Sequence, residues 1–339
     1  MDSLTHAALG AALATVVMGR RRPVWQSALL GATVATLPDM DVFLDGGDEF
    51  RSVITHRAET HALFWQALAA PLIAYLLAAM TRSRELYLRW LSMVVLVLFT
   101  HSALDTMTVY GTRIGLPFTD RPFGVGSLFI IDPLYTLPLL AGVIFTLALR
   151  RQSAQRWCAL GLTLSAAYAG WSIAAQTNVT AHALAAPEAD GLEAERVLVT
   201  PTPFNTLVWR IVLLHDEHYD EGFYSLLDPW TEPDRPIQFT RFSRGAGIDA
   251  RTREFDQANV IREFTRGYYA LADDGNQVTI TNLLAGQYPY YAYTFAFAEH
   301  QTDTLGEVHP TRYAQNMPVR QGLSWLWGRA RGLDVAPPG

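Results

Sequence analysis

Long apolar segments separated by short polar connections dominate the first half of the chain. Six of them are recognisable, at residues 4–18, 24–37, 61–80, 87–106, 128–149 and 157–176. The last four are about 20 residues long, enough for a helix to cross a hydrocarbon core of ~30 Å. The first two are about 15 residues long and are expected to form short or partly submerged helices. Stretches such as LSMVVLVLF and LPLLAGVIFTLAL lack a polar face, which favours membrane helices over buried helices of a soluble protein.

The second half of the chain has the pattern of a water-soluble domain. Residues 179–196 are rich in alanine and acids and are expected to form a linker. Residues 252–272 have apolar positions at helical spacing, and a last amphipathic helix, VRQGLSWLWGRA, is expected to lie on the membrane surface. Short runs of β-branched and aromatic residues predict strands in three regions, RVLVTPTPFNTLVWRIVLLHDEHYDEGFYSLL, NQVTITNLL and YYAYTFAFAEH.

These patterns predict two domains, and the arginines predict their orientation. Residues 1–178 should form an α-helical membrane bundle of about six segments, and residues 179–339 an α+β extracytoplasmic domain. Loops 38–60 and 107–127 contain few arginines, whereas the other three connections are rich in them. Because arginine-rich loops stay in the cytoplasm, the N-terminus, both long loops and the C-terminal domain should face outward. The arginines of the cytoplasmic connections are Arg20, Arg21, Arg22, Arg82, Arg84, Arg89, Arg150, Arg151 and Arg156.

The charge balance argues against nucleic acid as a partner. Residues 1–178 contain 13 arginines and 11 acids, and residues 179–339 contain 13 and 21, so charges of +2 and −8 add to the net −6. An acidic soluble half lacks the basic surface that nucleic acid requires. The single cysteine, Cys158, cannot form an intrachain disulfide. The first arginines follow the first apolar segment instead of preceding it, so a signal peptide is not expected.

Acids and histidines gather at the predicted outer ends of the apolar segments. Residues four apart in a helix share a face, which pairs His6 with Asp2 and His101 with Asp105. The orientation was predicted from arginines alone, so the position of all these groups on one side is an independent observation. The motifs are MDSLTH with Asp2 and His6, LPDMD with Asp39 and Asp41, THRAETH with His56 and His61, THSALDT with His101 and Asp105, and IIDP with Asp132.

Together these side chains predict a metal site, although each pair alone is more typical of a local hydrogen bond or a helix stop. An aspartate facing lipid at the bilayer centre costs ~2.5–3.5 kcal/mol, so such residues turn inward towards partners. Carboxylates only accept hydrogen bonds, and a cation satisfies several of them at once. Imidazole with carboxylate suits zinc, and manganese or magnesium are possible. The candidate ligands are His6, Asp41, His56, His61, His101 and Asp105; the choices between Asp39 and Asp41 and between His56 and His61 stay open.

Five ordered motifs carry a resemblance to a known family. MDSLTHAALG, LPDMD, HRAETHAL, HSALDTMTVYGTRIGLPF and IIDPLY, over roughly residues 1–150, resemble the YdjM-like family, described as membrane-bound metal-dependent hydrolases of bacteria and archaea. That family is similar, more distantly, to zinc-dependent phospholipases C and fungal single-strand nucleases, whose ligand order is His, Asp, His, then His-x-x-x-Asp. The order here is His6, Asp39 or Asp41, His61 or His56, His101 and Asp105. The second His-x-x-x-acid pair that helps hold a third zinc is missing, so the resemblance implies one or two ions.

We therefore expect an integral protein of the cytoplasmic (inner) membrane that hydrolyses a phosphoester or lipid-like substrate at its outer face. A water activated by the divalent ion would attack the substrate. Asp39 or Asp2 is expected to act as general base or to orient a histidine, and Arg57 has the planar fork that matches phosphate.

Two alternatives to an enzyme remain. One is a membrane metal-binding regulatory or structural protein without catalysis. The other is a divalent-metal transporter, which would need polar residues at mid-bilayer in several segments. A further pair in the second half, His215 and His218 of HDEH, is more typical of a surface turn than of a metal site, because no motif of the first half predicts it.

Overall fold

The chain folds into a helical unit and a unit built on antiparallel sheets. The computed structural model describes residues 1–43, 48–149, 155–231, 235–301, 304–313, 315 and 317–338; Arg150 and Arg151, used above to predict orientation, lie outside them. Unit 1 comprises Met1–Gly46, Thr55–Ile173 and Pro203–Asn205, and unit 2 comprises Gly47–Ile54, Ala174–Thr202 and Thr206–Gly339.

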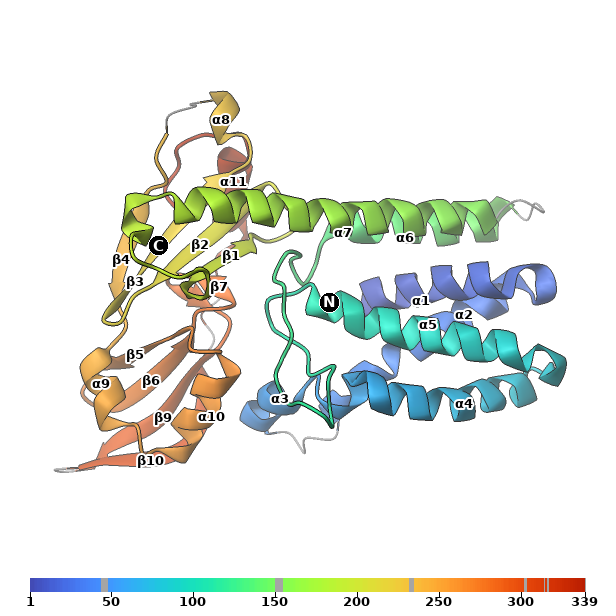
Figure 1. Cartoon of the computed structure of the whole chain (residues 1–339), viewed down its shortest axis with the longest axis horizontal. Coiled ribbons are helices and arrows are strands. Elements are labelled where there is room, and N and C mark those ends of the chain that lie inside the picture. Colours follow the sequence, from blue (N-terminus) through green and yellow to red (C-terminus); the bar gives the residue numbers. More distant parts are fainter. Residues whose placement is uncertain are drawn as a thin grey trace. The chain divides into compact units, whose positions relative to one another are not determined.

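All six predicted apolar segments form helices, which belong to unit 1 except for the end of the last one. They are α1 (Ser3–Met18), α2 (Val24–Thr36), α4 (Leu63–Met80), α5 (Tyr87–Thr106), α6 (Pro133–Leu149) and α7 (Gln155–Leu184), seen in Figure 1. Within the described residues, three helices are long and apolar enough to cross a membrane, at Leu63–Met80, Arg84–Thr106 and Gln155–Leu184. Helix α6 is a shorter apolar helix, and α1 and α2 are shorter still.

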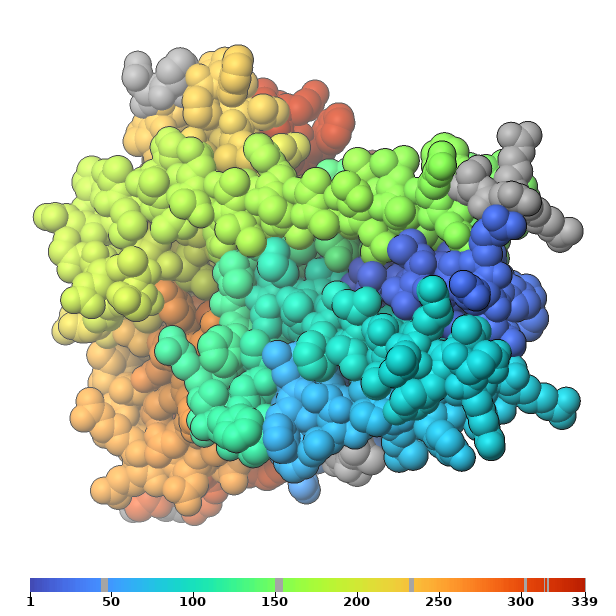
Figure 2. All heavy atoms as spheres, turned by 45° about the vertical axis from the view of Figure 1, so that its right-hand side comes forward, coloured from blue at the N-terminus to red at the C-terminus, as the bar shows by residue number. Residues whose placement is uncertain are grey.

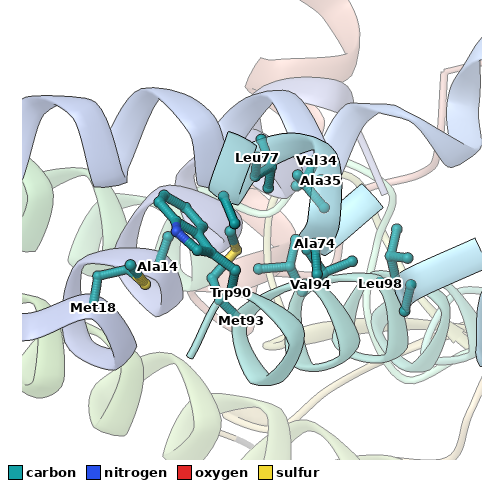
Figure 3. Packing of buried hydrophobic residues seen from close by; sticks show 13 residues of the cluster. Ala14, Met18, Val34, Ala35, Ala74, Leu77, Trp90, Met93, Val94 and Leu98 are labelled. Atoms are coloured by element: carbon teal, nitrogen blue, oxygen red, sulfur yellow. The ribbon is translucent and has the colours of Figure 1, made fainter. Parts of the chain in front are cut away.

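An apolar core joins α1, α2, α4 and α5. Trp90 and Met93 of α5 are completely buried and pack with Ala74 and Leu77 of α4 and with Met18 of α1 (Figure 3). In contrast, α4 presents leucines to the outside, with Leu68 60% and Leu72 62% exposed. Side chains of α4 and α5, in blue and cyan, form much of the surface of this unit on the face shown in Figure 2. A helix with one buried side and an exposed leucine surface is suited to a lipid environment.

Two glycines let α1 and α2 approach each other closely. A Cβ atom on Gly31 would lie 2.3 Å from both the carbonyl oxygen of Gly10 and the Cβ of Ala14. A Cβ on Gly10 would lie 2.4 Å from the carbonyl oxygen of Gly31. Small residues at such a crossing are characteristic of helix packing in membranes. This contact fixes α1, which carries His6, against α2, which leads directly to Asp39.

Unit 2 contains two four-stranded antiparallel sheets. The first has the order β1-β2-β3-β4, from Val197–Pro201, Val208–Leu214, His218–Ser225 and Phe239–Ser243. The second has the order β10-β9-β6-β5, from Thr304–Tyr313, Thr294–Gln301, Gln277–Asn282 and Tyr269–Asp273. A small hairpin pairs β7 (Gly286–Gln287) with β8 (Tyr290–Tyr291). After the first strand, the described helices of this unit are α8 (Asp228–Thr231), α9 (Ala246–Arg251), α10 (Asp256–Phe264) and α11 (Val319–Ala330).

Each sheet of unit 2 has its own core. The end of α7 packs on the first sheet through Val179 and Ala183, both completely buried. Helix α10 covers the second sheet, together with α3 (Glu49–Thr55), whose Phe50 stacks edge-on against Phe295 at 5.6 Å between ring centroids. The segment 49–54, although it lies between α2 and α4 in sequence, therefore belongs to the sheet-containing unit.

Two sequence predictions for the second half are corrected. The helix expected over 252–272 is α10 alone, which ends at Phe264; Arg266 and Gly267 then take positive φ angles of 55° and 84°, and residues 269–273 form β5. The linker expected from residue 179 begins later, because α7 continues to Leu184. The apolar periodicity continues past Phe264, but the helix ends at this residue because the chain reverses at Gly267. The predicted strand regions and the last helix are confirmed.

The glycine crossing predicts that Gly31→Ala destabilises unit 1. The added Cβ meets backbone atoms of α1, which can only move away, and such overpacking costs about 1–3 kcal/mol. Thermal unfolding in detergent should show a lower Tm for Gly31→Ala. Gly170→Ala in α7 is the matched control, since a Cβ there has no atom within 4 Å and alanine favours helix. Equal Tm values for the two variants would contradict the close crossing.

Candidate metal centre

Four side chains from three parts of the helical unit bring one ligand atom each to a common point. The Nε2 atoms of His61 and His101 are 3.1 Å apart. Asp39 Oδ1 lies 3.4 Å from each of these nitrogens, and Asp105 Oδ2 lies 3.3 Å from His61 and 3.4 Å from His101. The side chains of His61, His101 and Asp105 are at most 1% exposed, whereas Asp39 is 18% exposed. This group could hold a metal ion.

The spacing of these atoms matches the coordination preferences of zinc. Ligand atoms at 2.0–2.1 Å from a tetrahedral ion lie about 3.3–3.4 Å from one another. The distances between the four atoms, where they are given above, fall between 3.1 and 3.4 Å. Asp105 Oδ2 is buried without a hydrogen-bond partner, which is costly for a carboxylate oxygen unless a cation is present. The residues therefore fit a divalent ion with two imidazole and two carboxylate ligands.

Local structure explains how each ligand reaches this point. His101 and Asp105 are separated by one turn of α5 and thus lie on one face. Asp39 follows Pro38, which stops α2 and turns the chain into the 3-10 segment Pro38–Phe43. His61 ends the 3-10 turn Glu59–His61, directly before α4 begins.

The second oxygen of Asp105 is held by a separate set of donors. Oδ1 contacts the Met1 amino group, accepts a hydrogen bond from His6 Nε2 at 3.2 Å, and pairs with the Arg57 guanidinium at 3.0 Å. All of these groups are buried. Because three donors hold Oδ1, only Oδ2 faces His61 and His101.

His6 lies beside the four-residue group, not within it. Its ring stacks on that of His101, with 3.7 Å between centroids and 24° between planes. The hydrogen bond from His6 holds Asp105, and the stacking holds the ring of His101. Both of these residues direct a ligand atom towards the candidate ion. His6 thus supports two ligands, a role that the sequence pattern of His and Asp pairs could not distinguish from ligation.

Arg57 is held in an unusual backbone conformation. Its φ angle is +64°, in the left-handed region that is strained for residues other than glycine. The backbone N–H donates to Asp41 Oδ2 at 3.2 Å, and the carbonyl accepts from the N–H of Arg113 at 3.0 Å. The side chain spans Asp105 and Thr108, donating to the Thr108 hydroxyl at 2.9 Å, and its Nε has no hydrogen-bond partner. Strain of this kind collects at functional sites.

Asp41, together with His56, lies on the Nδ1 side of His61, opposite the candidate ion. Asp41 Oδ1 lies 2.8 Å from His56 Nδ1, and its Oδ2 accepts a hydrogen bond from the Thr60 hydroxyl at 2.9 Å. The Thr60 oxygen in turn lies 2.9 Å from His61 Nδ1. Since the Thr60 proton goes to Asp41, the His61 N–H must be on Nδ1, which leaves Nε2 unprotonated and free to bind an ion. Carboxylates commonly orient metal-binding histidines in this way.

The two aspartates of the 3-10 segment are ionised at neutral pH. Burial alone would raise the pKa of Asp39, but the neighbouring imidazoles of His101 and His61 outweigh burial and hold that pKa well below its usual range. Burial likewise acts to raise the pKa of Asp41, and the hydrogen bond from His56 lowers it below its usual value. Both groups are therefore anionic where a cation would bind.

Two of the singled-out acids cap helices. Asp2 is the N-cap of α1, and its carboxylate accepts from the N–H and the hydroxyl of Thr5 at 3.0 and 2.5 Å. Asp132 caps α6, accepting from the N–H of Leu134 at 3.0 Å, and its other oxygen accepts from the Tyr168 hydroxyl at 2.9 Å. Neither belongs to the group of four ligand atoms.

Sequence reasoning missed two supporting residues, Thr60 and Gln66. Gln66 of α4 is 4% exposed and donates to the Thr60 carbonyl at 3.0 Å and to the Ser102 hydroxyl at 2.7 Å. It therefore ties the turn that carries His61 to the helix that carries His101. A glutamine within an apolar helix was a visible signal, because such a residue needs a buried partner. Nothing local in the sequence distinguishes Thr60 from other loop threonines.

The fold and the site define a class: a membrane protein whose helical bundle buries a histidine and aspartate cluster at one end of its helices. A comparison with protein families matches residues 1–179 to the YdjM inner membrane protein family. The chain belongs to that family, which confirms the resemblance seen in its motifs. Comparisons with curated proteins and with solved structures gave no significant match.

The Asp41–Thr60–His61 chain predicts a weakened metal site in Thr60→Val. Valine keeps the shape of threonine but breaks the link that orients His61, and loss of such a link typically costs 10–100-fold in metal affinity. Zinc affinity measured by competition with a chelator dye should fall by that factor. Thr100→Val in α5 is the control, because the Thr100 hydroxyl bonds only to carbonyls of its own helix. Unchanged zinc affinity in Thr60→Val would show that His61 is oriented without this chain.

Proposed function

We propose that this protein is an integral membrane hydrolase that uses one divalent ion, zinc, to cleave a phosphoester or lipid-like substrate at the outer face of the membrane. The observation that carries the proposal is the convergence of Asp39, His61, His101 and Asp105 on one point, with spacing that suits a tetrahedral ion. A divalent ion held there would lower the pKa of water and supply hydroxide at neutral pH.

The difference in burial assigns roles to the four residues. Catalysis needs three fixed ligands and one position that water or substrate can take. His61, His101 and Asp105 are buried and supported by neighbours, which makes them the fixed ligands. Asp39, at 18% exposure, lies on the open side, where water would take its place as fourth ligand and Asp39 would accept a proton from that water.

One ion, and not two, follows from the surroundings of Asp105. A second ion would have to bind Oδ1, with His6 as a further ligand. That oxygen is already held by the Met1 amino group, His6 and Arg57. The guanidinium of Arg57 is a cation that would repel a metal ion, so Arg57 takes the electrostatic place of the second cation.

Arg57 also supports the choice of an anionic substrate. Its terminal nitrogens are committed to Asp105 and Thr108, but its Nε–H has no partner and remains available. A phosphoester oxygen is the kind of acceptor that a guanidinium recognises. The preference for a phosphoester over a carboxylester or amide rests on the distant resemblance to phospholipases C. Membrane lipid is the proposed neighbour or substrate, and nucleic acid is not an expected partner.

A closed structural site is the second candidate. Asp39 Oδ1 is as close to the two histidines as Asp105 Oδ2 is, so it could complete a four-coordinate site of the kind that serves structure alone. A transporter is less well supported. Apart from His6, His101 and Asp105, helices α1, α2, α4 and α5 contain no acid or histidine that would continue a path across the membrane.

The topology proposed from arginines, with six segments and both termini outside, gains support from α3. Phe50 and Val53 of this segment are buried in the core of the second sheet, which supports a topology with loop 38–60 and the C-terminal unit on the same side of the membrane. The arginine count independently predicts that both lie on the outer side. The candidate ligand Asp39 comes from that same loop.

Metal content and hydrolysis, measured together, test the proposed activity. The protein in lipid nanodiscs, stripped with EDTA and reloaded with zinc, is offered phosphodiesters, phosphomonoesters, carboxylesters, amides and a fluorescent phospholipid. Hydrolysis of a phosphoester is expected, and His101→Ala and Asp105→Ala should lose the zinc of this centre together with the activity. Asp39→Ala should keep zinc but fall to background activity. His182→Ala is the control, since its ring bonds only within α7 and stacks on Tyr224.

The outcomes separate the two candidates. Loss of zinc from Asp39→Ala would favour the closed structural site. Full zinc content without turnover of any substrate would overturn the hydrolase and leave a metal-binding protein. Full zinc content in His101→Ala would show that the assigned ligands are wrong.

The topology is tested by a reporter enzyme that is active only outside the cytoplasm. Fused after Gly339, it should be active, and fused within the connection at residues 82–84 it should be inactive. Both expectations follow from the arginine-rich connections lying in the cytoplasm. The reverse pattern would overturn the orientation, and activity at both positions would overturn the number of segments between them.

A further inference from the structure

The turn between β2 and β3 brings two histidines and an aspartate to one face of the first sheet. His215 donates its backbone N–H to the carbonyl of His218 at 3.0 Å, so the two residues face each other where the hairpin closes. Residues opposite each other in an antiparallel pair point to the same face, and so do residues two apart along a strand. Asp220, two residues after His218 in β3, therefore lies on the face that both histidines share.

The ligand atoms of these residues meet without satisfying one another. His215 Nε2 and His218 Nε2 lie 3.5 and 3.8 Å from Asp220 Oδ2, beyond the usual length of a hydrogen bond. The two rings stack with 4.3 Å between centroids and 16° between planes. Both Nε2 atoms are buried and have no hydrogen-bond partner. Leaving two such nitrogens unsatisfied costs free energy, and a cation between them and the carboxylate satisfies all three.

Arg241 orients the carboxylate from the other side. It lies opposite Asp220 in the pairing of β3 with β4, and its guanidinium donates to Asp220 Oδ1 at 2.8 Å and Oδ2 at 3.0 Å. Each carboxylate oxygen has two lone pairs, so Oδ2 can accept from Arg241 and still face an ion. Arg241 thus resembles the hydrogen-bonding partners that commonly hold a metal-binding carboxylate.

The site opens into a cavity with acidic walls. This cavity, about 630 Å³ in volume, is lined by the turn residues His215–His218 and by the segment 190–193 that follows α7. Asp190, Glu193, Asp216 and Glu217 are among its lining residues, and Arg196 is the cation among them. A cation can therefore approach the histidines through an electronegative entrance.

We propose that His215, His218 and Asp220 form a second divalent-metal site, for a transition ion of the zinc type. Imidazole with carboxylate selects such ions over calcium or magnesium, which prefer oxygen ligands alone. Three protein ligands leave at least one position for water or a further ligand on the cavity side. This site lies wholly in unit 2 and shares no residue with the candidate centre of unit 1, so it does not depend on the proposed hydrolase.

The test uses the full chain in detergent with the first site removed. Equilibrium dialysis against zinc, with zinc measured by mass spectrometry, compares His101→Ala with the triple variant His101→Ala, His215→Ala, His218→Ala. The His101→Ala protein should bind one zinc that the triple variant lacks, and zinc should raise its Tm but not that of the triple variant. Cobalt loaded in place of zinc should give visible absorption bands in the first protein only. His101→Ala, His300→Ala is the control, because His300 pairs with the nearby Asp273 at 2.9 Å in an ordinary ion pair.

Each outcome decides the question. Equal zinc content in His101→Ala and in the triple variant, with both folded by circular dichroism, would overturn the second site. Loss of zinc from the His300 control would also overturn it, by showing that surface histidines bind the metal without selection. If the triple variant does not fold, Asp220→Asn in the His101→Ala background replaces it and should lose the same zinc. If only the proposed site of unit 1 were wrong, the result would be different: wild type and His101→Ala would bind the same amount of zinc.

Discussion

The buried carboxylate of Asp105 is the group on which the helical unit depends. Its side chain has no contact with solvent, and an isolated charge there would be very costly. One oxygen is compensated by the Met1 amino group, His6 and Arg57, and the other faces two histidines. The negative charge of this one buried side chain therefore requires residues that are far apart in the sequence to lie next to it. Removal of one partner would leave part of this buried charge uncompensated, which destabilises the fold.

Helix packing determines how accurately this compensation is achieved. The apolar contacts of Trp90 and Met93 keep α5 against α4 and α1, and the Gly10–Gly31 crossing sets the distance between α1 and α2. These contacts contribute no chemistry, but they place the ends of four helices within reach of one another. The arrangement is typical of membrane proteins, in which an apolar body supports a polar site at one end.

The two candidate centres illustrate different ways to assemble similar ligands. In unit 1 the ligands come from separate helices and turns, and their convergence needs the whole bundle. In unit 2 the histidines and Asp220 come from one hairpin, and the pleat of the sheet alone puts them on one face. The first centre is buried and the second lies at the wall of an open cavity. Buried ligands suit control of reactivity, whereas ligands at a cavity wall suit exchange with solvent.

The sequence by itself determined the helices of the first half, most strands of the second, and the identity of the residues at the site. Apolar length and periodicity are local properties, which is why α5 was predicted with its exact bounds. The pairing of His101 with Asp105 also follows from local helical geometry. The end of α10 was misplaced because the reversal at Gly267 competes with a periodicity that continues past it.

Only the tertiary structure decided which acids and histidines face a common point. Asp39 and Asp41 are two residues apart in the same motif, yet Asp39 joins the ligand atoms while Asp41 supports His61 through Thr60. Asp2 looked equivalent to both and caps a helix instead. The same limit applies to HDEH, whose third partner, Asp220, becomes visible only when the hairpin aligns it with the two histidines. The sequence shows which residues could bind a metal, but the direction in which each side chain points depends on contacts between segments that are distant along the chain.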